Sequence, residues 1–69
     1  MANFQISMEA ARVNAKLTQE GAAEKLGVSR SAVINWENGK TTPSTAIVIA
    51  MATIYGIPVE YISMPRKTT

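Results

Sequence analysis

Apolar residues in this chain recur every three or four positions, and small polar residues interrupt them at short intervals. That period is typical of helices with one buried face, and the alternating pattern of a half-buried strand is absent. Four hydroxyl residues stand just before the apolar runs and are the expected helix N-caps: Ser7, Thr18, Ser29 and Ser44. Three glycines stand where the runs end and are the expected helix stops: Gly27, Gly39 and Gly56.

These boundaries predict five short helices, expected over residues 8–16, 19–26, 30–38, 45–55 and 58–62. Only Gly27, Val28 and Ser29 separate the second helix from the third, and so short a turn forces the two to cross at a large angle. The expected fold class is all-α, a compact five-helix domain with a helix-turn-helix at its second and third helices. We expect this single domain over residues 1–64, followed by a frayed basic tail over residues 65–69.

The composition of the chain limits the classes of protein to which it can belong. At 69 residues the chain is one domain whose small core needs well-packed helices or a second subunit. Because it has neither Cys nor His, it lacks disulfides and the usual zinc ligands. The net charge of +2 favours an anionic partner only weakly. The chain shows no membrane span and no signal peptide, so we expect a cytoplasmic protein.

The segment from Leu17 to Lys40 reads LTQEGAAEKLGVSRSAVINWENGK. Its opening Thr18-Gln19, its Gly27-Val28-Ser29 turn and its closing Trp36-Glu37-Asn38-Gly39-Lys40 resemble the helix-turn-helix of the lambda repressor and Cro family, also called the XRE family. The resemblance covers about residues 11–62, because Pro43-Ser44 and the segment from Gly56 to Ile62 also match the family pattern.

The resemblance implies a lambda-repressor-like domain that binds double-stranded DNA and regulates transcription. It implies a Cro-like repressor of phage or bacterial origin, bound as a homodimer to a near-palindromic operator on the nucleoid. It implies no cofactor, metal or small-molecule ligand. A second regulatory protein is a further partner to consider.

In this family the N-terminal part of the third helix enters the major groove. The polar residues expected there on the outward stripe are Arg30, Ser31 and Asn35. Arg suits guanine O6 and N7, Asn suits adenine N6 and N7, and Ser serves either a base or a phosphate. The alternative is that all three are ordinary solvated side chains.

The resemblance also implies contacts with the DNA backbone. Gln19 and Thr18 open the second helix, whose N-terminal amides suit a phosphate, although Gln19 as a simple first helical residue is an equal alternative. Lys40 follows the helix stop in a loop that faces the DNA backbone in relatives. Thr41 is a further phosphate candidate.

Arg12 and Glu37 match a buried ion pair that relatives form between the first and third helices. We interpret the pair as structural, because removing one partner would leave a buried charge uncompensated, at a cost of about 3–5 kcal/mol. Gly21 departs from the family, whose usual Glu would complete a capping box with Thr18, so the second helix is expected to be less firmly held at its start.

The fourth helix is apolar on nearly every face. Family register predicts its core face as Val48, Ile49, Met51, Ala52 and Tyr55. We expect the remaining apolar face, centred on Ile47 and Ala50 with Ala46, to form a homodimer contact. The alternative is a surface that tolerates a few alanines and one isoleucine.

No enzyme is expected, because the chain lacks His and Cys, its five carboxylates are scattered and no phosphate-binding glycine loop is present. The competing function is a helical protein-interaction module or antirepressor that uses the apolar face of the fourth helix. Arg30 and Asn35 distinguish the two, since a pure protein binder has no need of them.

Overall fold

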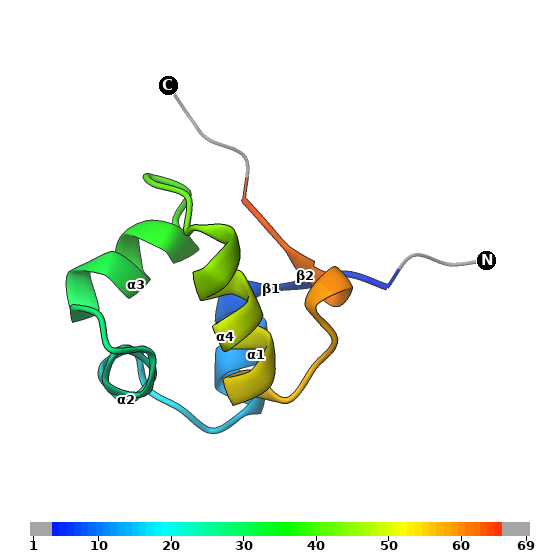
Figure 1. Ribbon diagram of the computed structural model, residues 1–69, viewed down its shortest axis with the longest axis horizontal. Helices are drawn as coiled ribbons and strands as arrows, with labels where there is room; N and C mark the ends of the chain where they lie inside the picture. Colours follow the sequence, from blue (N-terminus) through cyan, green and yellow to red (C-terminus); the bar gives the residue numbers. More distant parts are fainter. Residues whose placement is uncertain (1–3, 66–69) are drawn as a thin grey trace.

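The computed structural model describes residues 4–65. Its elements in chain order are β1 (Ile6–Ser7), α1 (Met8–Asn14), α2 (Gln19–Leu26), α3 (Arg30–Glu37), α4 (Thr45–Tyr55), the 3-10 turn η1 (Val59–Tyr61) and β2 (Ile62–Ser63). Figure 1 shows α1 behind α4, with α2 and α3 on one side of them and the strands and η1 on the other.

The four helices begin where the sequence predicted, because a hydroxyl oxygen at each cap accepts the N–H of the residue three positions on. The pairs are Ser7 with Ala10, Thr18 with Gly21, Ser29 with Ala32, and Ser44 with Ile47. Each bond satisfies a backbone donor that the first turn of a helix leaves without a partner. The predicted stops at Gly27 and Gly56 are also confirmed, since both adopt the left-handed conformation.

The first helix is shorter than predicted. It was expected to reach Lys16 but ends at Asn14, and Lys16 turns the chain in the left-handed region with a φ of 64°. The turn is closed by backbone bonds from Lys16 to the carbonyl of Val13 and from Leu17 to that of Arg12. No glycine or proline marks this end, so the sequence carried no stop signal there.

The predicted all-α, five-helix class is wrong in its last element. The fifth helix is a single 3-10 turn, closed by a bond from Tyr61 N–H to the carbonyl of Pro58. The chain then extends, and Ile62 pairs in parallel with Ile6 to form a short two-stranded sheet. Strands of two residues are too short to show an alternating pattern, so only the meeting of the two chain ends creates them.

The core lies between α1, α2, α4 and β2. Its buried residues are Met8, Ala11, Ala22, Met51, Ala52, Tyr55 and Ile62. Ala11 and Ala22 are fully buried, and their small side chains let the helices approach closely. Val33 of α3 is also buried, while Trp36 packs against the same core with part of its surface exposed.

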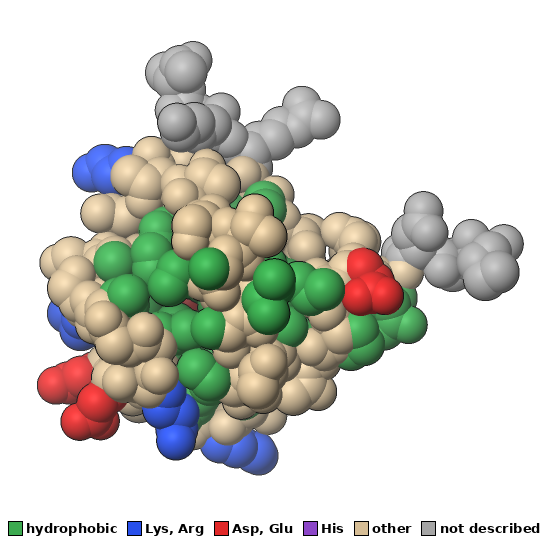
Figure 2. Space-filling model, in the orientation of Figure 1, with side chains coloured by type: hydrophobic (Ala, Val, Ile, Leu, Met, Phe, Trp, Pro, Cys, Tyr) green, Lys and Arg blue, Asp and Glu red, His purple; other side chains and the backbone are tan. Residues whose placement is uncertain are grey.

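The face of α4 that points into the core differs from the prediction at Ile49 and Ile47. Figure 2 shows hydrophobic side chains at the surface in the middle of the molecule, where α4 lies in Figure 1. Met51, Ala52 and Tyr55 are buried as expected, but the side chain of Ile49 is 52% exposed. Ile47, expected on the outer face, packs partly against the core. Because successive residues of a helix are about 100° apart, Ile49 lies on nearly the opposite side from Met51.

None of the helices within residues 4–65 is long and apolar enough to cross a membrane. Residues 66–69, most of the predicted basic tail, lie outside the described residues.

Candidate nucleic-acid interface

The turn between α2 and α3 sets the angle at which the two helices cross. Gly27 has a φ of 73°, a conformation that glycine adopts without strain. The next residue, Val28, donates its backbone N–H to the carbonyl of Ala23 at 3.0 Å. Ala23 is buried, so its small side chain lets α3 lie close to α2. These contacts build the helix-turn-helix predicted from the sequence.

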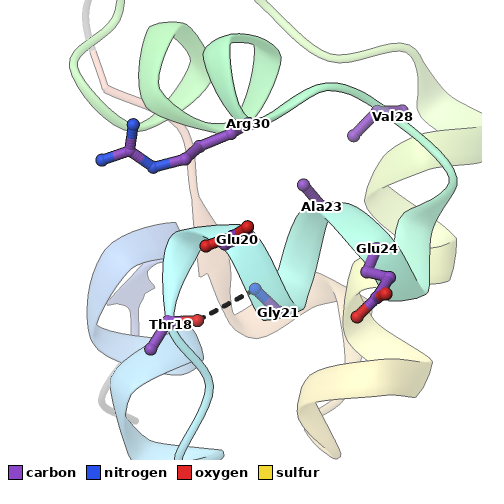
Figure 3. Close-up of a pocket in the computed structure, with 7 residues that line it drawn as sticks. All are labelled: Thr18, Glu20, Gly21, Ala23, Glu24, Val28 and Arg30. Atoms are coloured by element: carbon purple, nitrogen blue, oxygen red, sulfur yellow. Dashed lines mark hydrogen bonds between the residues drawn. The ribbon is translucent and has the colours of Figure 1, made fainter.

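Arg30 at the start of α3 lies above the first turn of α2, which carries Thr18, Glu20 and Gly21 (Figure 3). The residues that line an open hollow between α2 and α3 are Thr18, Glu20, Gly21, Ala23, Glu24, Val28 and Arg30. Two carboxylates lie there with one guanidinium, so the hollow itself is not a cationic cradle for phosphate. Thr18, a candidate phosphate contact, and Arg30, a candidate base contact, both line it.

The three candidate base contacts lie along α3. Arg30 and Ser31 form its exposed first turn, and Asn35 lies just over one turn further on, where it is half-buried. The carbonyl of Asn35 accepts the backbone N–H groups of Lys40 and Thr41 at 2.9 and 3.3 Å. The side chains of Arg30 and Ser31 therefore extend into solvent from the helix end, while the backbone of Asn35 anchors the loop that follows.

The candidate phosphate contacts lie in two places. Thr18 and Gln19 are at the start of α2, and Lys40 and Thr41 are in the loop after α3. Thr18 is exposed, and because its oxygen accepts the N–H of Gly21 at 2.9 Å, its hydroxyl hydrogen remains able to donate to another acceptor. Lys40 and Thr41 are also exposed.

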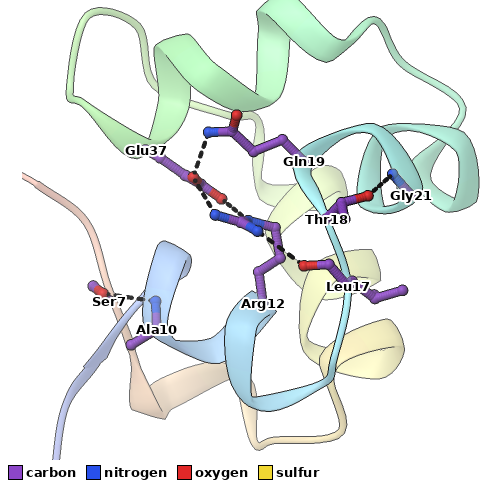
Figure 4. Close-up of polar contacts among 8 residues, drawn as sticks. All are labelled: Ser7, Ala10, Arg12, Leu17, Thr18, Gln19, Gly21 and Glu37. Atoms are coloured by element: carbon purple, nitrogen blue, oxygen red, sulfur yellow. Dashed lines mark hydrogen bonds and ion pairs between the residues drawn. The ribbon is translucent and has the colours of Figure 1, made fainter.

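A polar network links α1, α2 and α3 behind this surface (Figure 4). Arg12 Nε donates to Glu37 Oε2 at 2.7 Å, and its two other nitrogens donate to Glu37 Oε1 at 3.2 Å and to the carbonyl of Leu17 at 2.9 Å. The hydrogen bond to Glu37 raises the pKa of Arg12 above its ordinary value, against the opposing effect of burial. This forked pair joins the end of α3 to α1 and to the loop before α2.

Gln19 is also part of the network, which the sequence did not indicate. Its side-chain Nε2 donates to Glu37 Oε1 at 3.1 Å, so it bonds a carboxylate at the far end of α3. The two residues are 18 positions apart in the chain and match no helical spacing, so no local signal pointed to the bond.

Comparison with known proteins agrees with this geometry. The family described as Helix-turn-helix matches residues 8–62, which is most of the chain. An uncharacterized HTH-type transcriptional regulator of Methanocaldococcus jannaschii is 46% identical over 44 residues, or 64% of this chain and 67% of that protein. No solved structure gives a significant match to the chain.

The matched residues include the four capped helices, the Gly27 turn and the network around Glu37. The chain therefore belongs to the helix-turn-helix family of DNA-binding proteins, in the lambda repressor and Cro branch that its sequence resembles.

Proposed function

We propose that this protein is a transcription regulator that binds double-stranded DNA sequence-specifically by placing the start of α3 in the major groove. The observation that carries the proposal is the exposed first turn of α3, where Arg30 and Ser31 extend into solvent. This helix start follows directly on the turn over residues 27–29, whose Val28 N–H bonds to the carbonyl of Ala23. Within residues 4–65 no ion pair holds Arg30. The name of the M. jannaschii relative supports regulation of transcription.

Base recognition follows from the chemistry of these side chains. The Arg30 guanidinium matches guanine O6 and N7 in the major groove, and the Asn35 amide matches adenine N6 and N7. Ser31 bonds a base or a phosphate. Asn35 is half-buried, so it reaches a base only where α3 lies deep in the groove.

Contacts with the DNA backbone hold α3 in register. Thr18 and Gln19 bind a phosphate at the start of α2, and Lys40 and Thr41 bind a second one beyond the end of α3. Only Lys40 of these four is cationic, so most of this grip comes from neutral donors.

The binding unit is a homodimer on a near-palindromic operator. Two copies related by a two-fold axis place their α3 helices about 34 Å apart, one turn of DNA. The contact predicted at Ala46, Ile47 and Ala50 of α4 stays a proposal, now centred on Ile49 because Ile47 packs inward. No charged residue lies on α4, so two copies of this helix meet without charge repulsion.

Such a dimer represses, as a Cro-like protein would, by occupying a promoter in the bacterial cytoplasm, on the nucleoid. A second candidate function is favoured by one observation, the exposed side chain of Ile49 on an uncharged helix. In that case α4 binds another regulatory protein and the domain acts as an interaction module or antirepressor.

Selection from a randomised duplex pool, followed by sequencing of the bound fraction, tests the proposal. We expect a palindromic consensus, and we expect Arg30→Ala to relax one position in each half-site, with a loss of about 1–3 kcal/mol per contact. Lys25→Ala is the matched control, because Lys25 is an exposed cation in the last turn of α2. A pool with no enriched sequence would reject DNA reading and favour the interaction module.

A further inference from the structure

The Glu37 carboxylate receives donors from two different helices. Its Oε1 accepts both Arg12 Nη2 at 3.2 Å and Gln19 Nε2 at 3.1 Å, and its Oε2 accepts Arg12 Nε at 2.7 Å. The Glu37 side chain is only 5% exposed, so these bonds are shielded from water. Arg12 alone would balance the charge of Glu37, but the carboxylate also holds the side chain of Gln19, the first residue of α2.

The hydrogen bond to Glu37 fixes the orientation of the Gln19 side-chain amide. Nε2 lies toward Glu37, and in Figure 4 the carbonyl oxygen points away from it. A flipped amide would place its oxygen against the carboxylate oxygen, and neither atom has a hydrogen to donate. Gln19 is half-buried at the edge of α2, so its second Nε2 hydrogen remains available for another acceptor.

We propose that Glu37 is a positioning residue for DNA binding: it holds the Gln19 amide in the one orientation that offers the free Nε2 hydrogen to a backbone phosphate. This inference rests on the proposed DNA-binding function. A phosphate oxygen accepts hydrogen bonds but does not donate, so only the nitrogen end of the amide is useful to it.

The gain comes from ordering Gln19 before DNA arrives. A long side chain that is immobilised only on binding lowers affinity by about threefold to tenfold. In the free protein, the Glu37 bond already restricts this side chain. The purely structural alternative is that Glu37 serves Arg12 alone and its bond to Gln19 has no effect on DNA.

A methylphosphonate scan of the DNA distinguishes the positioning role from the structural alternative, because each substitution removes the charge of one phosphate. The scan uses the duplex that the wild-type protein selects, and it measures Kd for the full-length wild type, Gln19→Met and Glu37→Gln. Glu60→Gln is the matched control, because Glu60 is an exposed acid in η1, outside the network. Circular dichroism confirms that each variant is folded.

We expect the methylphosphonate beside the start of α2 to weaken wild-type binding about tenfold. The same methylphosphonate should weaken Gln19→Met by no more than about threefold, because the Gln19 contact is already lost and only that of Thr18 remains. Glu37→Gln should lose sensitivity at the same phosphate and no other, with base preference unchanged. A folded Glu37→Gln protein that keeps the wild-type sensitivity, or that loses affinity evenly at every phosphate, overturns the proposal.

The order of the Gln19 side-chain amide in the free wild-type protein gives a second test that needs no Glu37 variant. We expect an NMR order parameter near the value of about 0.85 typical of rigid backbone, and a value below about 0.6 overturns the proposal. If the wild type selects no duplex at all, the DNA-binding function fails first, and this outcome differs from a failure at Glu37 alone.

Discussion

Tyr55 ends α4 and buries a hydroxyl group that has no hydrogen-bond partner within the described residues. Its side chain packs in the core close to the charges of Arg12 and Glu37. Burial raises the pKa of Tyr55 above its ordinary value, the Glu37 carboxylate raises it further, and Arg12 acts in the opposite direction. A buried hydroxyl without a partner destabilises the folded state, because water bonds it in the unfolded chain.

Replacing Tyr55 by Phe should therefore stabilise the protein. The ring stays in the core and the desolvated hydroxyl is removed, so we expect a gain of about 1 kcal/mol, or about 4–8 °C in Tm for a domain of this size. Thermal unfolding followed by circular dichroism measures it. Tyr61→Phe is the control, because the Tyr61 side chain is 40% exposed. Loss of its hydroxyl group should leave Tm unchanged. A lower Tm in Tyr55→Phe would show that the hydroxyl is satisfied.

The raised pKa of Tyr55 predicts that the folded protein loses stability in alkaline solution. Because the pKa of Tyr55 is higher in the folded protein, the folded state keeps its proton at a pH where the unfolded chain has released it. The free energy of unfolding should then be unaffected by Tyr55 below about pH 10 and should fall as pH rises beyond it. Urea titrations between pH 9 and pH 11 test the sign. Tyr55→Phe should fall less steeply than the wild type, and equal slopes would contradict the prediction.

At the scale of elements, the end of α1 depends on a strained residue. Lys16 has a φ of 64°, a conformation that costs a residue with a Cβ about 1–2 kcal/mol. Other left-handed turns that end helices in this chain use glycine, as at Gly27 and Gly56. The strain persists because the Arg12 network and the bond from Leu17 N–H to the Arg12 carbonyl hold the loop in place.

Lys16→Gly should stabilise the protein by about 0.5–1 kcal/mol, since relief of strain exceeds the extra entropy that glycine gives the unfolded chain. Urea denaturation measures the change. The matched control is Lys25→Gly in α2, where the backbone is helical and the same substitution should destabilise by about 1 kcal/mol. Destabilisation by both variants would show that the left-handed turn carries no strain.

For the whole molecule, charge limits how the protein holds DNA. Residues 4–65 contain five Lys or Arg and five Glu, which cancel, and the chain's net +2 comes from Arg66 and Lys67. The candidate base and phosphate contacts include only two cations, Arg30 and Lys40. Neutral donors bind phosphate without releasing counterions, so the affinity should depend on salt less than in a strongly basic protein.

The expected salt dependence follows from that count. Lys40 is the one cation among the proposed phosphate contacts, since Arg30 is assigned to a base. With one phosphate neutralised per subunit, log K should fall against log salt with a slope of about −2 for the dimer. Fluorescence anisotropy on the selected duplex at several salt concentrations measures it. Lys40→Ala should reduce the slope by about one per subunit. A slope twice as steep would mean that cations outside the proposed interface contact the DNA.

The dimer proposal is also tested at this scale. Ile49→Glu places a charge at the centre of the proposed α4 contact, so we expect a monomer in analytical ultracentrifugation and weaker operator binding. Val13→Glu on α1 is the control, because Val13 is 55% exposed against 52% for Ile49 but lies on another helix. A dimer that survives Ile49→Glu would place the two-fold contact elsewhere.

The sequence by itself determined where the four helices begin, where α2 and α4 end, and the central turn. A cap hydroxyl bonds an N–H three residues away, and a left-handed stop needs a glycine at one position, so both signals are local. The same locality placed Arg30 and Ser31 on an exposed helix end. The pairing of Arg12 with Glu37 was predicted from family resemblance and not from their spacing, because the two residues lie on separate helices.

Only the tertiary structure decided which side of α4 faces inward, because a helix that is apolar all round has no polar face to orient it. Packing against α1, α2 and β2 buried Met51 and left Ile49 exposed. Folding also paired Ile6 with Ile62 and brought Gln19 to Glu37. Those partners are far apart in the chain, and a single sequence contains the period of each helix but not the distances between helices.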